Sequence, residues 1–185
     1  LNEGDWEAVR KDINLRPVSV MRNGEKFVVD GNSEEKDITE VLAHYGIAAE
    51  AVTLWGTGKP LREFLWSEEM ADASVHVLLN VDFKQTYDDS VKNADGITEI
   101  RNCHINVGTG KELSIREVAE KIMKEIGFKG ELRWDASKPD GTLRKLTDVS
   151  KLHSLGWHHK VEIDEGIHRL YEWYLKGICI NHQTV

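Results

Sequence analysis

Two loops constrain this chain more than any other feature of its sequence. They span 52–65 (VTLWGTGKPLREFL) and 135–148 (DASKPDGTLRKLTD), and each combines chain-bending glycine and proline with cations. The formal net charge is −8, so an anion is repelled at long range unless cations are concentrated locally. Four cations stand where a core has no need of charge: Arg62, Lys138, Arg144 and Lys145. The loops therefore predict a site for a polar, phosphate-bearing small molecule.

The familiar cofactor motifs are incomplete in this sequence. Leu61 and Leu113 occupy the place of the third glycine in G-x-G-x-x-G, the turn that lets a backbone approach a pyrophosphate. Thr53 and Ile105 stand where the first glycine of a P-loop belongs, and no tyrosine is followed four residues later by lysine. We identify no nucleophile and base, and we interpret the chain, which begins at Leu1, as a piece of a larger protein.

Composition indicates a globular protein with one domain and a small appendage. A chain of 185 residues buries roughly 70% of its unfolded surface, and no apolar run reaches the roughly 18 residues that span a membrane. The acidic balance argues against a nucleic-acid partner. Cys103 and Cys179 form no disulfide framework, so we expect reduced thiols in a cytoplasmic protein. His153, His158 and His159 have no acidic or cysteine partner at ligand spacing, so we predict no metal site.

Residues 1–51 are predicted to form an appendage of a helix, a hairpin and a second helix. Asp5 is placed to cap the first helix, which ends before Pro17. Strands over 18–22 and 25–29 flank Asn23-Gly24, a two-residue turn that favours hairpins. The second helix ends near Gly46 and has an apolar face of Ile38, Val41, Leu42 and Tyr45.

From residue 52 the pattern predicts short strands and amphipathic helices. The expected strands cover 52–55, 103–107 and 132–134, and a surface loop covers 84–96. Ser67 is expected to cap a helix whose inner face holds Met70, Ser74, Val77 and Leu78. Ser114 and Glu117 form a capping box before a helix with a buried stripe of Ile115, Val118, Ala119, Ile122 and Ile126, which Gly127 ends. Helices over 149–155 and 164–175 follow, the last burying Ile167, Leu170, Tyr171 and Tyr174.

Trp55 and Arg62 are the candidates in the first loop. An indole beside two glycines can stack on a base or a sugar, but Trp55 can equally be the end of a core strand. The guanidinium of Arg62 matches a phosphate with two parallel bonds, but it can also pair with Glu63, Glu68 or Glu69.

The second loop presents Asp140 next to cations. Its Pro139-Asp140-Gly141 turn allows Asp140 to accept bonds from sugar hydroxyls while Lys138, Arg144 and Lys145 meet phosphate. The alternative is a solvated loop whose charges pair among themselves. Gly108-Thr109-Gly110 precedes a helix start, a place that binds anions, but nearby acidic residues favour a structural turn.

Five stretches, in order, make the sequence similar to the GDP-L-fucose synthase family of extended short-chain dehydrogenase/reductases. They run from Val52 to about Leu175, or 124 of 185 residues. The pattern WGTG-x-P-x-REF followed by SKPDGT-x-RK is the most specific part, because glycine turns alone are common. The stretches are LWGTGKPLREFL, EEMADASVHVL, HINVGTGKELSIREVAEKI, DASKPDGTLRKLTD and KLHSLGWHHKVEIDEGI.

The resemblance implies the C-terminal, substrate-binding part of an enzyme that makes GDP-L-fucose. It implies that the complete enzyme epimerises and then reduces GDP-4-keto-6-deoxymannose with NADPH, and that it is a homodimer. Trp55, Arg62, Asp140 and Lys145 match family positions near the GDP-sugar. The family's cofactor-binding and catalytic residues belong to an earlier Rossmann domain and have no match here; Cys103 does not fall at the catalytic cysteine.

We therefore predict an α/β substrate-binding domain over 52–177, with 1–51 as an insertion or appendage and 178–185 as a tail. The expected partners are the GDP-sugar and the missing Rossmann domain, with no nucleic acid and no membrane. We expect neither bound cofactor nor turnover in the 185-residue chain by itself. Two alternatives remain: a stand-alone nucleotide-sugar-binding or interaction module, and part of another nucleotide-sugar epimerase/reductase.

Overall fold

A computed structural model describes residues 1, 3–22 and 24–180 of the chain. Within that part, six α-helices and seven short strands confirm the predicted α/β class. The chain divides into two compact units, which we describe separately. The first contains Leu1–Gly58 and Gly127–Asp140, and the second contains Lys59–Ile126 and the chain from Gly141 onward. The predicted domain boundaries, including the one at residue 51, stay predictions.

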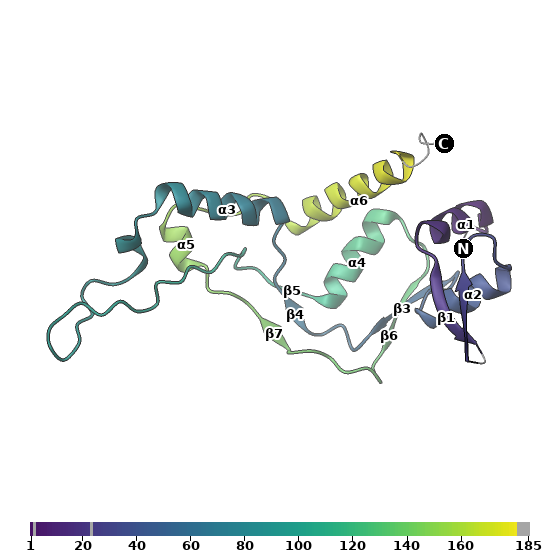
Figure 1. Cartoon of the computed structure of the whole chain (residues 1–185), viewed down its shortest axis with the longest axis horizontal. Coiled ribbons are helices and arrows are strands. Elements are labelled where there is room, and N and C mark those ends of the chain that lie inside the picture. The colour runs from purple at the N-terminus through teal and green to yellow at the C-terminus, as the bar shows by residue number, and fades with distance from the viewer. Residues whose placement is uncertain (2, 23, 181–185) are drawn as a thin grey trace. The chain divides into compact units, whose positions relative to one another are not determined.

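The first unit is built on a hairpin and two helices (Figure 1). Helix α1 (Trp6–Leu15) begins as predicted, because an Asp5 carboxylate oxygen accepts the Ala8 amide at 3.0 Å. Strands β1 (Val18–Arg22) and β2 (Glu25–Val29) pair antiparallel with Arg22 opposite Glu25, which confirms the hairpin; Asn23 of its turn lies outside the described residues. Helix α2 (Glu35–His44) then packs on the hairpin.

The core of this unit is apolar and comes from α1, β2 and α2. Its buried residues are Ile13, Val29, Ile38 and Val41. The remaining strands of the unit, β3 (Ala51–Trp55) and β6 (Glu131–Asp135), lie side by side in Figure 1. They pair in parallel, with Trp55 opposite Asp135, so the two loops that follow them leave from the same edge.

The second unit contains a three-stranded sheet of two-residue strands. Strand β4 (Leu61–Arg62) is central, pairing antiparallel with β5 (Leu113–Ser114) and parallel with β7 (Arg144–Lys145). Helix α4 (Ile115–Ile126) follows β5 through the predicted capping box: the Ser114 amide donates to Glu117 at 2.7 Å, and the Glu117 amide donates to the Ser114 hydroxyl at 3.1 Å. Gly127, with φ of +72°, follows the helix as expected.

The remaining helices of this unit are α3 (Ser67–Asn80), a 3-10 turn at Phe83–Thr86, α5 (Ser150–Ser154) and α6 (Ile163–Ile180). The small core consists of Ala73, Leu152 and Trp157. The Trp157 indole donates to Asp72 at 2.8 Å, so the ring is held in place. None of the described helices is both long and apolar enough to span a membrane.

The predicted inner face of α3 is confirmed at Val77, which packs against the core, and is wrong at Met70, Ser74 and Leu78. Glu69 and Ala73 are buried, while Met70 and Ser74 are exposed and Leu78 is 81% exposed. The core selects the small side chain of Ala73 because Leu152 and Trp157 approach the helix closely. Ser67 is also not the cap, since the capping position is Trp66 and no side chain bonds there.

Other predicted apolar faces are only half covered. Tyr45 follows the last turn of α2 and is exposed. Helices α4 and α6 lie side by side (Figure 1), and this contact shields one edge of each helix. Four predicted core residues are therefore exposed within the described structure: Ile122, Ile126, Leu170 and Tyr174.

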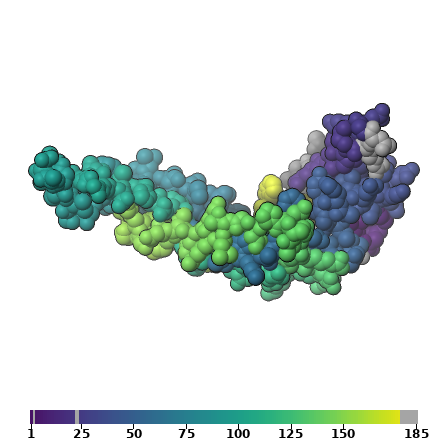
Figure 2. Space-filling view, turned by 90° about the horizontal axis from the view of Figure 1, so that it is seen from below, coloured from purple at the N-terminus to yellow at the C-terminus, as the bar shows by residue number. Residues whose placement is uncertain are grey.

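The predicted strand at 103–107 does not form, because no described strand pairs with it. Lys151 of α5 holds the segment instead, and its ammonium donates to the carbonyl oxygens of Thr86, Asn102 and His104. Figure 2 shows the teal atoms of this segment against the yellow-green atoms around α5. The predicted surface loop at 84–96 is largely exposed, apart from the turn that ends at buried Thr86.

Candidate functional site

The loop after β3 is fastened to the loop after β6 by one carboxylate. The amide of Thr57 donates to Asp140 Oδ1 at 2.8 Å, and the Thr57 hydroxyl donates to Asp140 Oδ2 at 2.6 Å. Gly56, at φ +81°, faces the same group, and a Cβ there would lie 2.3 Å from Asp140 Oδ1. Both Asp140 oxygens therefore have partners in the protein, and the carboxylate shapes the turn that presents Trp55.

Trp55 projects from this turn into solvent. Its side chain is among the exposed large apolar groups, at 76% exposure, so the alternative of a core strand end is wrong. The Lys138 ammonium lies 5.5 Å from the centroid of the ring, a distance at which a cation is attracted to an aromatic face. The exposed indole can stack on a base or a sugar, and the nearby ammonium of Lys138 can at the same time bind an anionic group.

In the second unit Arg62 is held by backbone carbonyls. Its Nη1 donates to the carbonyl oxygens of Leu61 at 2.6 Å and Thr142 at 2.7 Å. The alternative of a salt bridge with Glu63, Glu68 or Glu69 is not observed among the described residues. Within that same part of the chain, Nε and Nη2 make no hydrogen bond, so the guanidinium keeps donors available for a ligand.

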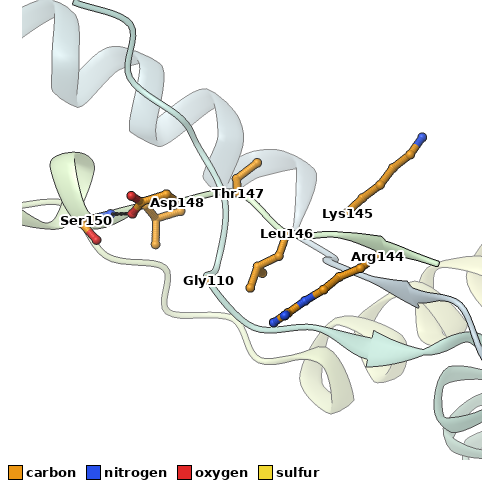
Figure 3. Close-up of a pocket in the computed structure, with 8 residues that line it drawn as sticks. Gly110, Arg144, Lys145, Leu146, Thr147, Asp148 and Ser150 are labelled. Atoms are coloured by element: carbon orange, nitrogen blue, oxygen red, sulfur yellow. Dashed lines mark hydrogen bonds between the residues drawn. The ribbon is translucent and has the colours of Figure 1, made fainter. Parts of the chain in front are cut away.

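Lys145 lies directly opposite Arg62 in the β4–β7 pair. It borders an open pocket of about 660 Å³, whose other lining residues are Gly110, Arg144 and residues 146–150. Figure 3 shows the Lys145 side chain pointing away from Arg144, as expected for neighbours on a strand. Arg144 is engaged by Glu112 through contacts of 2.9 and 2.7 Å, whereas Lys145 has no ion pair within the described chain.

The Gly108–Gly110 turn does bind an anion, and that anion is a side chain of the same unit. Glu63 Oε1 accepts the amides of Thr109 at 2.7 Å and Gly110 at 2.6 Å. Glu63 Oε2 accepts the amide of Thr147 at 3.2 Å and its hydroxyl at 2.5 Å. Burial opposes ionisation of Glu63, but these bonds outweigh it and hold its pKa below the ordinary value. The structural interpretation of this turn is therefore confirmed.

Two of the three histidines around Leu155–Trp157 stack on each other, and the third lies beside a glutamate. The rings of His153 and His158 stack at 4.2 Å, and His159 lies 3.3 Å from Glu162. Burial lowers the pKa of His153, and the charges of His158 and His159 lower it further. No group of three potential metal ligands occurs among the described residues.

The four predicted residues thus fall into two pairs. Trp55, the last residue of β3, and Asp140, in the loop after β6, belong to the first unit, whereas Arg62 and Lys145 belong to the sheet of the second. The sequence analysis missed the roles of Thr57 and Glu63. For Glu63 a signal was present: a glycine-flanked turn with amides to satisfy, and an acid beside the candidate arginine.

Known proteins share both the sequence and the fold of this chain. Residues 9–91 match the NAD dependent epimerase/dehydratase family. The chain is 46% identical over 131 residues to GDP-L-fucose synthase 1 of Arabidopsis thaliana. The aligned region covers 71% of this chain and 35% of that protein.

Two solved structures extend the comparison. A GDP-6-OMe-4-keto-L-xylo-heptose reductase from C. jejuni matches with a TM-score of 0.76 and 37% identity, over 96% of this chain and 44% of that one. A GDP-L-fucose synthetase from Naegleria fowleri bound to NADP matches with a TM-score of 0.54 and 25% identity, over 73% of this chain and 36% of that one. The chain therefore spans less than half the length of each of these proteins.

Together, the fold and the matched sequence define a member of the NAD-dependent epimerase/dehydratase family, a group of extended short-chain dehydrogenase/reductases. Within that family the chain is GDP-L-fucose synthase-like.

Proposed function

We propose that this chain supplies the GDP-sugar-binding residues of an NADPH-dependent epimerase/reductase that makes GDP-L-fucose. The observation that carries the proposal is the pairing of Arg62 with Lys145, because two cations on adjacent strands both lack a carboxylate partner within the described chain. On an acidic protein such a pair is a local source of positive charge. We assign it to the diphosphate of GDP-4-keto-6-deoxymannose.

The first unit contributes contacts of a different kind. The exposed face of Trp55 offers a stacking surface for a base or a sugar, worth about 1–3 kcal/mol per stacked base. Asp140 sets the backbone of that turn through Thr57, and as an acceptor it suits a sugar hydroxyl better than a phosphate. We therefore propose that Trp55 and Asp140 contact the neutral parts of the substrate.

Among the described residues, the two turns that begin a dinucleotide motif do not fit a bound nicotinamide dinucleotide. In the turn that most resembles a dinucleotide motif, the Thr109 and Gly110 amides are occupied by Glu63. A Cβ on Gly58 would meet the Trp134 ring at 2.7 Å, so that glycine serves packing. We propose that NADPH binds to a part of the enzyme outside this chain. The 185 residues alone should then show no GDP-keto-sugar-dependent NADPH oxidation, and measurable turnover would overturn this assignment.

The binding role is tested by paired arginine variants of the purified protein. Arg62→Ala removes available donors and should weaken GDP binding about tenfold, the equivalent of one charge-assisted hydrogen bond. Arg144→Ala is the matched control, because the guanidinium of Arg144 is already paired with Glu112. This substitution should change the affinity for GDP by no more than about twofold. Isothermal titration calorimetry measures both. Equal affinities of Arg62→Ala and the unsubstituted protein would refute the diphosphate site.

A reductase acting on a GDP-heptose is the second candidate, and one observation favours it. Residues 52–185 make up 134 of 185 residues, so a match over 96% of the chain must include most of residues 1–51. The C. jejuni heptose reductase has that match, whereas the Naegleria GDP-L-fucose synthetase covers 73%. Turnover by the complete enzyme of GDP-4-keto-6-deoxymannose against a GDP-4-keto-heptose would separate the two candidates.

A further inference from the structure

The sheet that carries Arg62 and Lys145 is too small to fix them by itself. Each of its three strands is two residues long, and strand pairing of that extent is marginal in water. Outside these paired residues, the Leu61 amide donates to the carbonyl oxygen of Leu143 at 2.7 Å. The relative position of the two cations therefore depends on contacts outside the strands.

Glu63 provides such contacts, because it follows Arg62 directly and reaches two other segments. Its Oε1 holds the Thr109–Gly110 turn, which leads into β5. Its Oε2 holds Thr147, which lies two residues beyond Lys145. One side chain thus links β4, the approach to β5 and the continuation of β7. These are the three strands of the sheet.

The fit around this carboxylate is close. A Cβ on Gly108 would lie 2.4 Å from Glu63 Oε1 and 2.5 Å from the Thr147 hydroxyl. The surrounding groups that bond Glu63 all act as donors: three backbone amides and the hydroxyls of Thr109 and Thr147. A neutral amide in its place would put an NH2 group against those donors, so the site requires a negative charge and not merely a side chain of that size.

We propose that Glu63 is a positioning residue for phosphate recognition, which holds Arg62 and Lys145 at the separation that a diphosphate requires. The proposal rests on the proposed function, in which these two cations bind the diphosphate. Glu63 itself faces the turn and carries a charge of the wrong sign for a phosphate, so it acts through its neighbours.

The test compares GDP with guanosine, which lacks the phosphates, as ligands of the purified protein. Glu63→Gln should reduce the preference for GDP over guanosine about tenfold and leave guanosine affinity unchanged. Glu69→Gln is the matched control, since Glu69 Oε1 also accepts two backbone amides in this unit, those of Lys160 and Val161, but touches none of the three strands. The Glu69→Gln variant should have a lower melting temperature and an unchanged preference for GDP over guanosine.

The outcomes separate this inference from the function on which it rests. An unsubstituted protein that binds GDP no more tightly than guanosine would remove the diphosphate site and this inference with it. A normal preference in the unsubstituted protein and in Glu63→Gln would overturn only the role of Glu63. Equal losses in Glu63→Gln and Glu69→Gln would also overturn that role, because they would show general destabilisation.

A second variant covers the case in which Glu63→Gln does not fold. Thr147→Val removes the hydroxyl that donates to Glu63 at 2.5 Å and keeps the shape of the side chain. It should reduce the preference for GDP about threefold to tenfold, with guanosine affinity unchanged. A folded Thr147→Val protein with the full preference for GDP would refute the inference.

Discussion

The core of the second unit allows a quantitative test of which side of α3 is buried. Leu152→Ala removes a fully buried side chain that packs with Ala73 and Trp157. The lost transfer free energy is roughly 2.4 kcal/mol for about three methylene equivalents, and a residual cavity adds to it. Trp157 is tethered to Asp72 and cannot move freely into the space. We therefore expect a loss of about 3–4 kcal/mol in the free energy of unfolding.

Leu78→Ala is the matched control, because it makes the same chemical change on α3 at a side chain that is 81% exposed. It should change stability by about 0.5 kcal/mol or less. Urea unfolding followed by circular dichroism gives the free energies, and hydrogen exchange of the α5 amides assigns the loss to the second unit. A cost for Leu78→Ala that equals that of Leu152→Ala would refute the assignment of the α3 face.

Two further predictions concern a helix cap and a surface histidine. Asp5→Ala should destabilise the first unit by about 1 kcal/mol, because the Ala8 amide loses its acceptor; an unchanged urea midpoint would contradict the cap. The bond to Glu125 raises the pKa of His168, partial burial opposes it, and neighbouring glutamates add to it. The stability that this pair contributes is therefore present below pH 6.5 and lost as pH rises through the raised pKa. NMR titration should show a lower His168 pKa in Glu125→Gln, and equal values would exclude the pairing.

The features that could be predicted from sequence are those set by neighbours along the chain. The Asp5 cap, the Ser114–Glu117 capping box and the hairpin around Gly24 each depend on residues at most a few positions apart. Short strands at 51–55 and 131–135 could be found as well, because loop residues bound them on both sides. Their parallel pairing joins residues 80 positions apart, such as Trp55 and Asp135, and carries no local signal.

The failures come from partners that are distant in sequence. The α3 face was misplaced because hydrophobicity favours Met70 and Leu78, whereas the core accepts Ala73 and uses Glu69 to bind backbone amides. The segment 103–107 has a strand-like composition, yet no described strand pairs with it, and Lys151 bonds the carbonyl oxygens of Asn102 and His104 at its start.

The candidate site shows the same division. Exposure of Trp55 and the available donors of Arg62 agree with one of the two interpretations that the sequence left open for each residue. Two other contacts could not be predicted, because the partners are distant in sequence. Asp140 bonds Thr57, 83 residues away, and Arg144 pairs with Glu112, 32 residues away. Residue type thus indicated which groups can bind a ligand, but not which of them also bond other side chains of the protein.

The occupied turn at Gly108–Gly110 has a meaning beyond this chain. Glycine-flanked amides before a helix are commonly searched for as nucleotide sites. Here the Glu63 carboxylate, directly after β4, already accepts the bonds of these amides. The carboxylate of Glu63 thus acts as an internal ligand of the turn, and its occupancy does not depend on the concentration of any metabolite. A glycine-rich signature therefore becomes a candidate nucleotide site only after it is shown that no nearby carboxylate already accepts the hydrogen bonds of its amides.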